Sequence, residues 1–213
     1  MGQQRVKEVE EKPKEKPKPK EAEVKKTKKW KGKDWFVILA PKMFREVSLA
    51  ETPATDPKSL LGRNVEVSAD VLTGNRRKYY MKLRFKINSV SERNAFTRFE
   101  GYACTRDYLY RIVRKRLQKV ETINEIKTKD GWKLQVTTLT VLNRNTETTT
   151  QGKVRAEVDR LWKETAEKST IEDIVKKTID GAIQNIIRKR GSKIYPVRFS
   201  EICKIEVLKT PEE

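Results

Sequence analysis

Residues 81–87 read MKLRFKI, and the alternation within this stretch decides the expected fold class. Every second residue is apolar and belongs to one face of an extended chain: Met81, Leu83, Phe85 and Ile87. The residues between them are cationic and belong to the other face: Lys82, Arg84 and Lys86. A period of two is the pattern of a strand with one buried face. The sequence therefore predicts a half-buried strand within residues 76–90.

Residues 65–71 (VEVSADV) alternate in the same way and predict the partner of this strand. The intervening Thr73-Gly74-Asn75 has the composition of a turn, so the two strands are expected to form a β-hairpin. The cations of the second strand, which follow Arg76, Arg77 and Lys78, have two interpretations. They either form cross-strand salt bridges with Glu66 and Asp70 or contact phosphates.

Further strands are expected on both sides of this hairpin. Residues 35–39 (WFVIL) predict a strand that ends before Pro41, with Trp35 in the core. Residues 50–62 contain two prolines and a glycine and predict a loop, whereas residues 95–104 predict another strand. A second hairpin is expected from residues 123–142, with its turn at Lys129-Asp130-Gly131.

The C-terminal third changes to the helical period. One face of a helix collects Val154, Val158, Leu161, Trp162 and Thr165. A second amphipathic helix is predicted over residues 171–190, with a capping box at residues 169–172 and Gly191 at its end. Residues 197–207 then predict a strand that returns to the sheet. The expected fold is α+β: a β-rich, barrel-like body of antiparallel hairpins, a short basic helix and two C-terminal helices.

The short basic helix is predicted to begin near Asp107 and to continue toward Lys119. Its apolar positions keep helical spacing: Leu109, Ile112, Val113 and Leu117. The remaining surface is cationic, and Asp107 is the only acid between Arg106 and Lys119. A helix that needs only solubility would alternate Glu with Lys at a spacing of four residues. The composition therefore favours a polyanionic partner for this helix.

The overall charge points in the same direction. The chain has 213 residues and a formal net charge of +19, and 37% of its residues are charged. A field of this sign attracts nucleic acid first and anionic membrane second. No apolar stretch has the length of a membrane-spanning helix, and the first residues do not have the apolar segment of a secretory signal. We therefore expect a cytoplasmic protein.

Catalysis and metal binding find little support in the sequence. There are no histidines, and the two cysteines, Cys104 and Cys203, are far apart. Zinc sites need four ligands, usually with closely spaced pairs, so two separate cysteines are expected to be small buried hydrophobes. Glycine motifs for phosphate or dinucleotide binding are absent from the sequence. These absences disfavour catalysis, a metal site and a cofactor site.

Residues 1–33 are predicted to form a flexible basic arm, followed by one α+β domain over residues 34–213. That domain divides into a mainly β part (34–146), a helical part (147–192) and a returning strand with a tail (193–213).

The arm of residues 1–33 holds thirteen basic and six acidic residues and has almost nothing to bury. It is either a solubilising tail or a segment that orders on nucleic acid. Trp30, within a run of lysines, either stacks on an unpaired base or packs against the protein's own body.

The candidate RNA-binding residues are the cations of the arm, the first hairpin, the basic helix and the end of the last helix, together with Trp30. They are Lys25, Lys26, Lys28, Lys29, Trp30, Lys31, Lys33, Arg76, Arg77, Lys78, Lys82, Arg84, Lys86, Arg106, Arg111, Arg114, Lys115, Arg116, Arg188, Lys189, Arg190 and Lys193. For the last cluster, stabilisation of the negative end of the helix dipole is an alternative that can coexist with RNA contact.

Several short blocks, taken in order, resemble one protein family. They are Lys33-Asp34-Trp35, residues 40–44 (APKMF), Gly62-Arg63, residues 66–68 (EVS), Thr97 with Phe99 and Gly101, Thr105-Arg106-Asp107, Asp130-Gly131 and Ile194-Tyr195-Pro196. Their order and spacing are similar to those of the archaeal and eukaryotic small-subunit ribosomal proteins traditionally called S-three-A-e. The likeness runs from about residue 33 to about residue 208. The tail composition and the lack of the long eukaryotic C-terminal extension resemble the archaeal members.

This resemblance implies a component of the small ribosomal subunit, on the platform near the mRNA exit and the 3′ end of the small-subunit rRNA. It implies rRNA and neighbouring ribosomal proteins as partners, with mRNA nearby, and no catalytic role. The alternatives are an RNA-modifying enzyme, which would need a cofactor loop or an acid–base pair, and a free RNA- or DNA-binding architectural protein.

Overall fold

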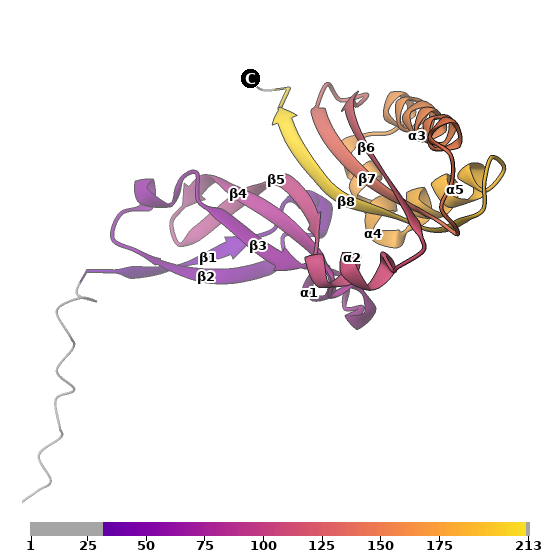
Figure 1. Cartoon of the computed structure of the whole chain (residues 1–213). Helices are drawn as coiled ribbons and strands as arrows, with labels where there is room; N and C mark the ends of the chain where they lie inside the picture. The colour runs from indigo at the N-terminus through magenta and orange to yellow at the C-terminus, as the bar shows by residue number, and fades with distance from the viewer. Residues whose placement is uncertain (1–31, 212–213) are drawn as a thin grey trace, which may run out of the picture. The chain divides into compact units, whose positions relative to one another are not determined.

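A computed structural model describes residues 32–211 of the chain (Figure 1). The strands are β1 (Asp34–Leu39), β2 (Ser48–Ala54), β3 (Asn64–Ser68), β4 (Met81–Ser91), β5 (Asn94–Cys104), β6 (Gln118–Lys127), β7 (Lys133–Leu142) and β8 (Val197–Lys209). The α-helices are α1 (Ala69–Thr73), α2 (Arg106–Ile112), α3 (Thr148–Lys168), α4 (Ile171–Asp180) and α5 (Ala182–Gly191). The predicted α+β class is confirmed.

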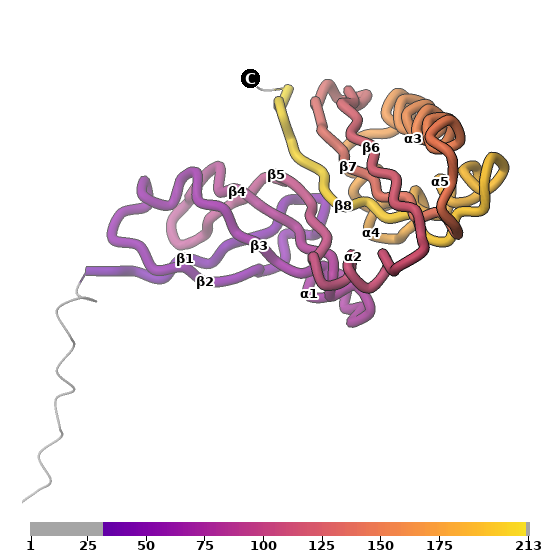
Figure 2. The backbone as a smooth tube through the Cα atoms, in the orientation of Figure 1, coloured from indigo at the N-terminus to yellow at the C-terminus, as the bar shows by residue number. Residues whose placement is uncertain are grey.

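All of these strands belong to one sheet, and β5 is its branch point. The strand order is β2-β1-β5-β8-β7-β6, with β4 also on β5 and β3 on β4. The first residues of β5 pair in parallel with β1, its whole length pairs with β4, and its last residues pair with β8. The backbone trace in Figure 2 follows β8 back from the C-terminal helices to its place between β5 and β7.

The junction of β5 and β8 is short and close. It consists of the pairs Gly101↔Glu206, Tyr102↔Ile205 and Ala103↔Lys204. A Cβ atom on Gly101 would lie 2.7 Å from the carbonyl oxygen of Ile205, inside van der Waals contact. Glycine is therefore required here because the two backbones approach too closely for any side chain. This approach connects the N-terminal strands to β6–β8.

The helices α3, α4 and α5 lie together beside β6, β7 and β8 (Figure 1). Trp162 of α3 is 1% exposed, and its indole N–H donates to the Thr138 hydroxyl of β7 at 2.9 Å. The turn between β6 and β7 also holds α4, because the Asp130 carboxylate accepts from the backbone N–H of Ile171 at 3.1 Å. The buried side chains of these helices and strands belong to one hydrophobic core that extends to Leu83 and Phe85 of β4.

Several predicted elements are confirmed. The alternating stretch 81–87 lies in β4, with its apolar residues buried, and pairs antiparallel with β3. The strand at 95–104 is β5, the second hairpin is β6–β7, and the returning strand is β8. The helix with Val154, Val158, Leu161 and Trp162 on its buried face is α3.

The predicted connection of the first hairpin is wrong. The chain leaves β3 at Ser68 and forms the helix α1 and the 3₁₀ turn η4 (Arg76–Lys78) before β4 begins at Met81. Gly74 ends α1 with a positive φ of 69° instead of forming a two-strand turn. Ala69 is fully buried, and the Thr73 hydroxyl donates to its carbonyl at 2.7 Å. Val71, expected to be on the buried face of a strand, is 55% exposed.

The N-terminal predictions need two corrections. Residues 50–54 of the expected loop belong to β2, an edge strand that pairs with β1. An edge strand tolerates Pro53 because its N–H side does not have to join a ladder. Trp35, expected in the core, is 54% exposed, because Phe36 and Ile38 are the residues of β1 that point inward.

The helical predictions also differ in their bounds. The basic helix α2 ends at Ile112, and Arg114, Lys115 and Arg116 lie in the connection to β6. The expected helix over 171–190 is two helices, α4 and α5, because Gly181 between them has a φ of 78°. There are thus three C-terminal helices instead of two. The N-cap of α4 is Thr170, which accepts from the Asp173 N–H, so the predicted capping box is displaced by one residue.

The close approach of β5 and β8 at Gly101 predicts that a glycine-to-alanine change has opposite effects on stability at Gly101 and at Gly152. We expect Gly101→Ala to lower the free energy of unfolding by about 1–3 kcal/mol, because the new methyl group collides with the Ile205 carbonyl. Gly152→Ala is the matched control, since Gly152 lies within α3 with nothing within 4 Å of an added Cβ. That change should raise stability by about 0.5–1 kcal/mol. Urea denaturation of both variants measures the difference, and equal stability would contradict this account of the junction.

Candidate nucleic-acid interface

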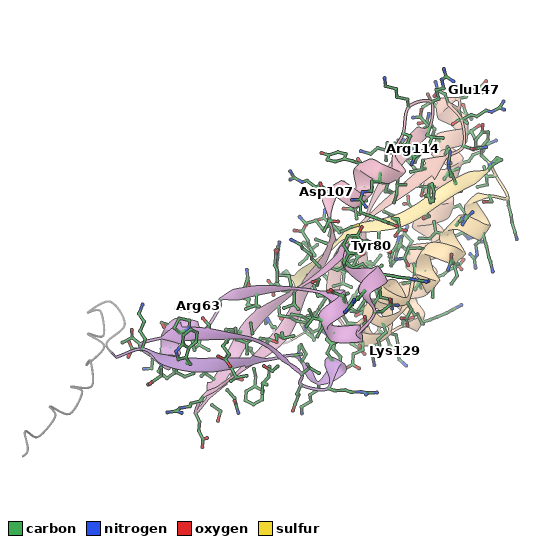
Figure 3. The ribbon with its side chains drawn as sticks, turned by 90° about the horizontal axis from the view of Figure 1, so that it is seen from below. Arg63, Tyr80, Asp107, Arg114, Lys129 and Glu147 are labelled. Carbon is green, nitrogen blue, oxygen red and sulfur yellow. The ribbon has the colours of Figure 1, made fainter. Side chains whose placement is uncertain are left out.

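Tyrosines and arginines of α2, of the segment before β4 and of α5 lie near one another. We call this group the tyrosine–arginine surface: Arg76, Arg77, Tyr79, Tyr80, Arg106, Tyr108, Tyr110, Arg111, Arg114 and Arg188. The guanidinium of Arg111 donates to the Tyr79 hydroxyl at 3.1 Å, which links α2 to the segment after η4. Tyr80 and Arg188 border the same hollow, which links that segment to α5. Figure 3 labels Asp107 in α2, Arg114 in the connection that follows α2, and Tyr80.

Two of the tyrosines are held in place by the fold. The rings of Tyr80 and Tyr108 are stacked, with 3.7 Å between centroids and 13° between planes. The Tyr108 hydroxyl donates to the Glu201 carboxylate of β8 at 3.0 Å. Burial, followed by the Glu201 charge, raises the pKa of both Tyr80 and Tyr108. Both phenols therefore remain neutral hydrogen-bond donors at physiological pH.

The other tyrosines are open to solvent. Tyr79 is 51% exposed and Tyr110 is 72% exposed. Aromatic side chains normally bury much of their surface, so these two exposed tyrosines near arginines are candidates for contact with a partner. Within α2, Arg106 and Tyr110 are four residues apart and share one side of the helix.

Most cations of this surface have no acidic partner. Arg76, Arg77, Arg106, Arg111, Arg114 and Arg188 are exposed, and none of them forms an ion pair within residues 32–211. The neighbouring Lys115 and Arg116 are exposed and unpaired in the same way, and Arg116 has a positive φ of 68°. Unpaired arginines around exposed aromatic rings have the chemistry that binds phosphates and stacks on bases.

Ion pairs within the described chain engage Lys78, Arg84 and Arg190, which were predicted to bind RNA. Lys78 pairs with Asp180 at the end of α4, with 3.0 Å between Nζ and Oδ1. Arg84 contacts Glu66 across β3–β4 with both Nε and Nη2, at 3.1 and 2.7 Å. Arg190 joins α5 to α3 through Glu164 at 3.0 Å and Glu157 at 3.8 Å. For Arg84, the geometry supports cross-strand salt bridging over phosphate contact.

The remaining predicted residues are dispersed. Lys82 and Lys86 lie on the outer side of β4, where the neighbouring Glu66 and Glu100 make the charge mixed. Lys189 and Lys193 are exposed near the end of α5, and Lys33 precedes β1. The arm residues Lys25, Lys26, Lys28, Lys29, Trp30 and Lys31 lie outside the described part of the chain. The hypotheses about Trp30 and the arm therefore stay predictions.

The tyrosines of this surface were not among the RNA-binding residues predicted from the sequence. Their signal was present in RRKYY at residues 76–80 and in RDYLYR at residues 106–111, where tyrosines lie close to arginines in the sequence. The hairpin prediction assigned Tyr79 and Tyr80 to a strand and so gave no reason to single them out. Only the tertiary fold shows that the two segments meet.

Other kinds of site find no support in the described residues. No group of three His, Cys, Asp or Glu side chains within residues 32–211 could hold a metal ion. Cys104 and Cys203 are free, and burial raises the pKa of their thiols to about 12 and about 11. They have the inert character expected of buried cysteines. None of the helices in this part of the chain has the length and apolarity needed to cross a membrane.

Comparison with known proteins confirms the resemblance seen in the sequence. The small ribosomal subunit protein eS1 of Methanothermobacter thermautotrophicus is 38% identical over 182 residues, which is 85% of this chain and 93% of that protein. The protein of the same name from Methanopyrus kandleri is 34% identical over 187 residues, 86% of this chain and 89% of that one. The Saccharolobus islandicus protein is 37% identical over 184 residues, with 86% and 88% covered. The Ribosomal S3Ae family model matches residues 21–211, and the chain therefore belongs to this family.

Proposed function

We propose that this chain is a structural protein of the small ribosomal subunit that binds small-subunit rRNA. Its family membership and the shared name of its relatives support the ribosomal role. The observation that carries RNA binding is the tyrosine–arginine surface, where arginines without acidic partners in the described chain surround exposed tyrosines. The role is architectural: the protein neutralises and positions folded RNA in the cytoplasm and does not catalyse a reaction.

The surface binds RNA through two physically distinct contributions. Each phosphate that an arginine neutralises releases condensed counterions, so affinity falls with salt. Stacking of a base on Tyr79 or Tyr110 is worth roughly 1–3 kcal/mol and does not depend on counterion release. Lys78, Arg84 and Arg190 contribute less, because binding RNA would break their existing ion pairs.

The position that we propose for the protein on the small subunit rests on the family resemblance. We propose that the protein lies on the platform of the small subunit, near the mRNA exit and the 3′ end of the rRNA, where it supports assembly and translation. Its neighbours there are other small-subunit proteins, and mRNA passes nearby. The basic arm of residues 1–33 adds phosphate contacts to those of the single α+β domain over residues 34–213.

The ribosomal role predicts how the protein sediments. In sucrose gradients of native lysate, we expect it to migrate with small subunits and to remain with them after a high-salt wash. Retention in high salt indicates burial and stacking in addition to simple charge attraction. Recovery only at the top of the gradient would contradict this and would indicate a free RNA- or DNA-binding architectural protein.

The surface itself predicts a change in salt dependence. Arg111→Gln with Arg114→Gln should reduce the slope of log affinity for small-subunit rRNA against log salt by roughly 0.7–0.9 per lost contact. The matched control is Arg160→Gln, which removes an exposed arginine of α3 that is paired with Glu164. Filter binding over a salt series measures both slopes. A slope that changes by the same amount per removed arginine in the control would show that net charge, and not this surface, determines binding.

A further inference from the structure

Three lysines lie opposite one another at one end of the sheet, and we call them the lysine row: Lys127, Lys133 and Lys209. Lys127 of β6 pairs with Lys133 of β7, and Lys133 pairs on its other side with Lys209 of β8. The register of β7 and β8 shifts next to Lys133, but Lys133 and Lys209 remain direct partners. Directly opposite residues share one face of a sheet, with Cβ atoms about 4.5–5.5 Å apart. The row therefore places three positive charges side by side.

The charges of the lysine row are not neutralised within the described chain. All three lysines are exposed, and none of them forms an ion pair within residues 32–211. The closest acids along these strands are Glu125 and Glu206. Glu206 already pairs with Lys204, and Glu125 is not in ion-pair contact with Lys127. Like charges directly opposite each other are destabilising, so the row favours the binding of an anion.

Other cations of the sheet are placed beside carboxylates. Arg84 pairs with Glu66 across β3 and β4, Lys119 pairs with Glu121 within β6, and Lys204 pairs with Glu206 within β8. Protection of an exposed edge does not explain the lysine row either. A lysine on the edge strand β6 can prevent pairing with another chain, but Lys133 lies in β7, which has a neighbouring strand on both sides.

The lysine row is separate from the tyrosine–arginine surface. The helix α2 packs on Leu139 and Val141 near the end of β7, whereas Lys133 begins that strand. At about 3.3 Å per residue, β7 separates the two by roughly 20–25 Å. Figure 1 shows α2 at one end of β6, β7 and β8, and the turn between β6 and β7 at the other. Lys129, labelled in Figure 3, adds another exposed lysine in that turn.

The chemistry of the lysine row fits a phosphate backbone. Three ammonium groups in a line match an anion that repeats its charge, as the phosphates of a nucleic acid do. Lysine is a point charge with rotatable donors, so it binds phosphate without requiring one geometry. The nearest aromatic residue in the sequence, Trp132, packs against the main core and does not offer a stacking platform. Contacts of this kind position RNA but do not read its bases.

We propose that the lysine row is a second RNA-binding site, which holds the phosphate backbone of an rRNA segment that crosses the ends of β6, β7 and β8. This inference rests on the proposed RNA-binding function. It adds a site for a different segment of RNA from the one at the tyrosine–arginine surface. Binding at the row has no base preference and relieves the repulsion among the lysines.

The first test compares two triple variants that lose the same charge. One carries Lys127→Gln, Lys133→Gln and Lys209→Gln. The matched control carries Lys119→Gln, Lys176→Gln and Lys204→Gln, which are lysines paired with acids. Filter binding of small-subunit rRNA over a salt series gives the slope of log affinity against log salt. The row variant should reduce this slope by roughly 2–3, and the control by less than about 1. Equal reductions would assign the effect to net charge and overturn the proposal.

The second test measures the repulsion within the row. Lys133 has a lysine on both sides, so Lys133→Gln should raise the urea midpoint of the RNA-free chain at low salt. The rise should shrink in high salt, because salt screens exposed charges. Lys176→Gln, which loses a pair with Glu172, should not raise the midpoint. An unchanged midpoint in Lys133→Gln would show that the row is already neutralised, for instance by Glu212 and Glu213 at the end of the sequence, and would overturn the proposal.

Failure of this site can be distinguished from failure of the proposed function. Arg111→Gln with Arg114→Gln acts at the distant surface, so its effect on the slope should add to that of the row variant. If the arginine variant lowers the slope and the row variant does not, only the lysine row fails as an RNA site. If the row variant binds free rRNA normally but is lost from small subunits in a salt wash, the row binds an acidic neighbouring protein, and its assignment to RNA is overturned.

Discussion

The contact between the Gly101 backbone and the Ile205 carbonyl is the constraint on which the rest of the structure depends. It lets β8 cross close to β5, and β8 then carries residues for two different tasks. Ile202 and Ile205 are buried in the main core, and Glu201 anchors Tyr108 of α2. A shift of β8 would therefore disturb the core and the tyrosine–arginine surface together.

The positive charge of the protein divides into two kinds of cation with different roles. Some cations pair with carboxylates and connect elements, as Lys78 does between η4 and α4 and Arg190 does between α5 and α3. Others, around α2, have no acidic neighbour in ion-pair contact within the described chain. Partly exposed ion pairs contribute little stability, so their main effect is to remove those cations from the set available to phosphates. Net charge predicts a polyanionic partner, and the pattern of ion pairs supports the surface that we propose for it.

Much of the fold could be predicted because its signals are local. The alternation in 81–87 and the helical period in 154–162 depend on nearby residues, and both describe the structure correctly. The errors arose where a short pattern fits two structures: residues 65–71 alternate like a strand, yet β3 ends at Ser68 and the rest of the stretch belongs to α1. Trp35 was misassigned because an apolar run does not show which of its residues face inward. The candidate surface was predicted in its cations but not in its tyrosines, since Tyr79 and Arg111 meet only through tertiary contacts.

The most direct test of this account is to map ultraviolet cross-links between the protein and rRNA in purified small subunits by mass spectrometry. The account predicts that cross-linked peptides of the described chain contain Tyr79 or Tyr110, because these exposed rings lie near unpaired arginines. Cross-links confined to the outer side of β4, around Lys82 and Lys86, would contradict it. That result would mean that RNA is bound by the mixed-charge face of the sheet, and that the tyrosine–arginine surface serves another partner.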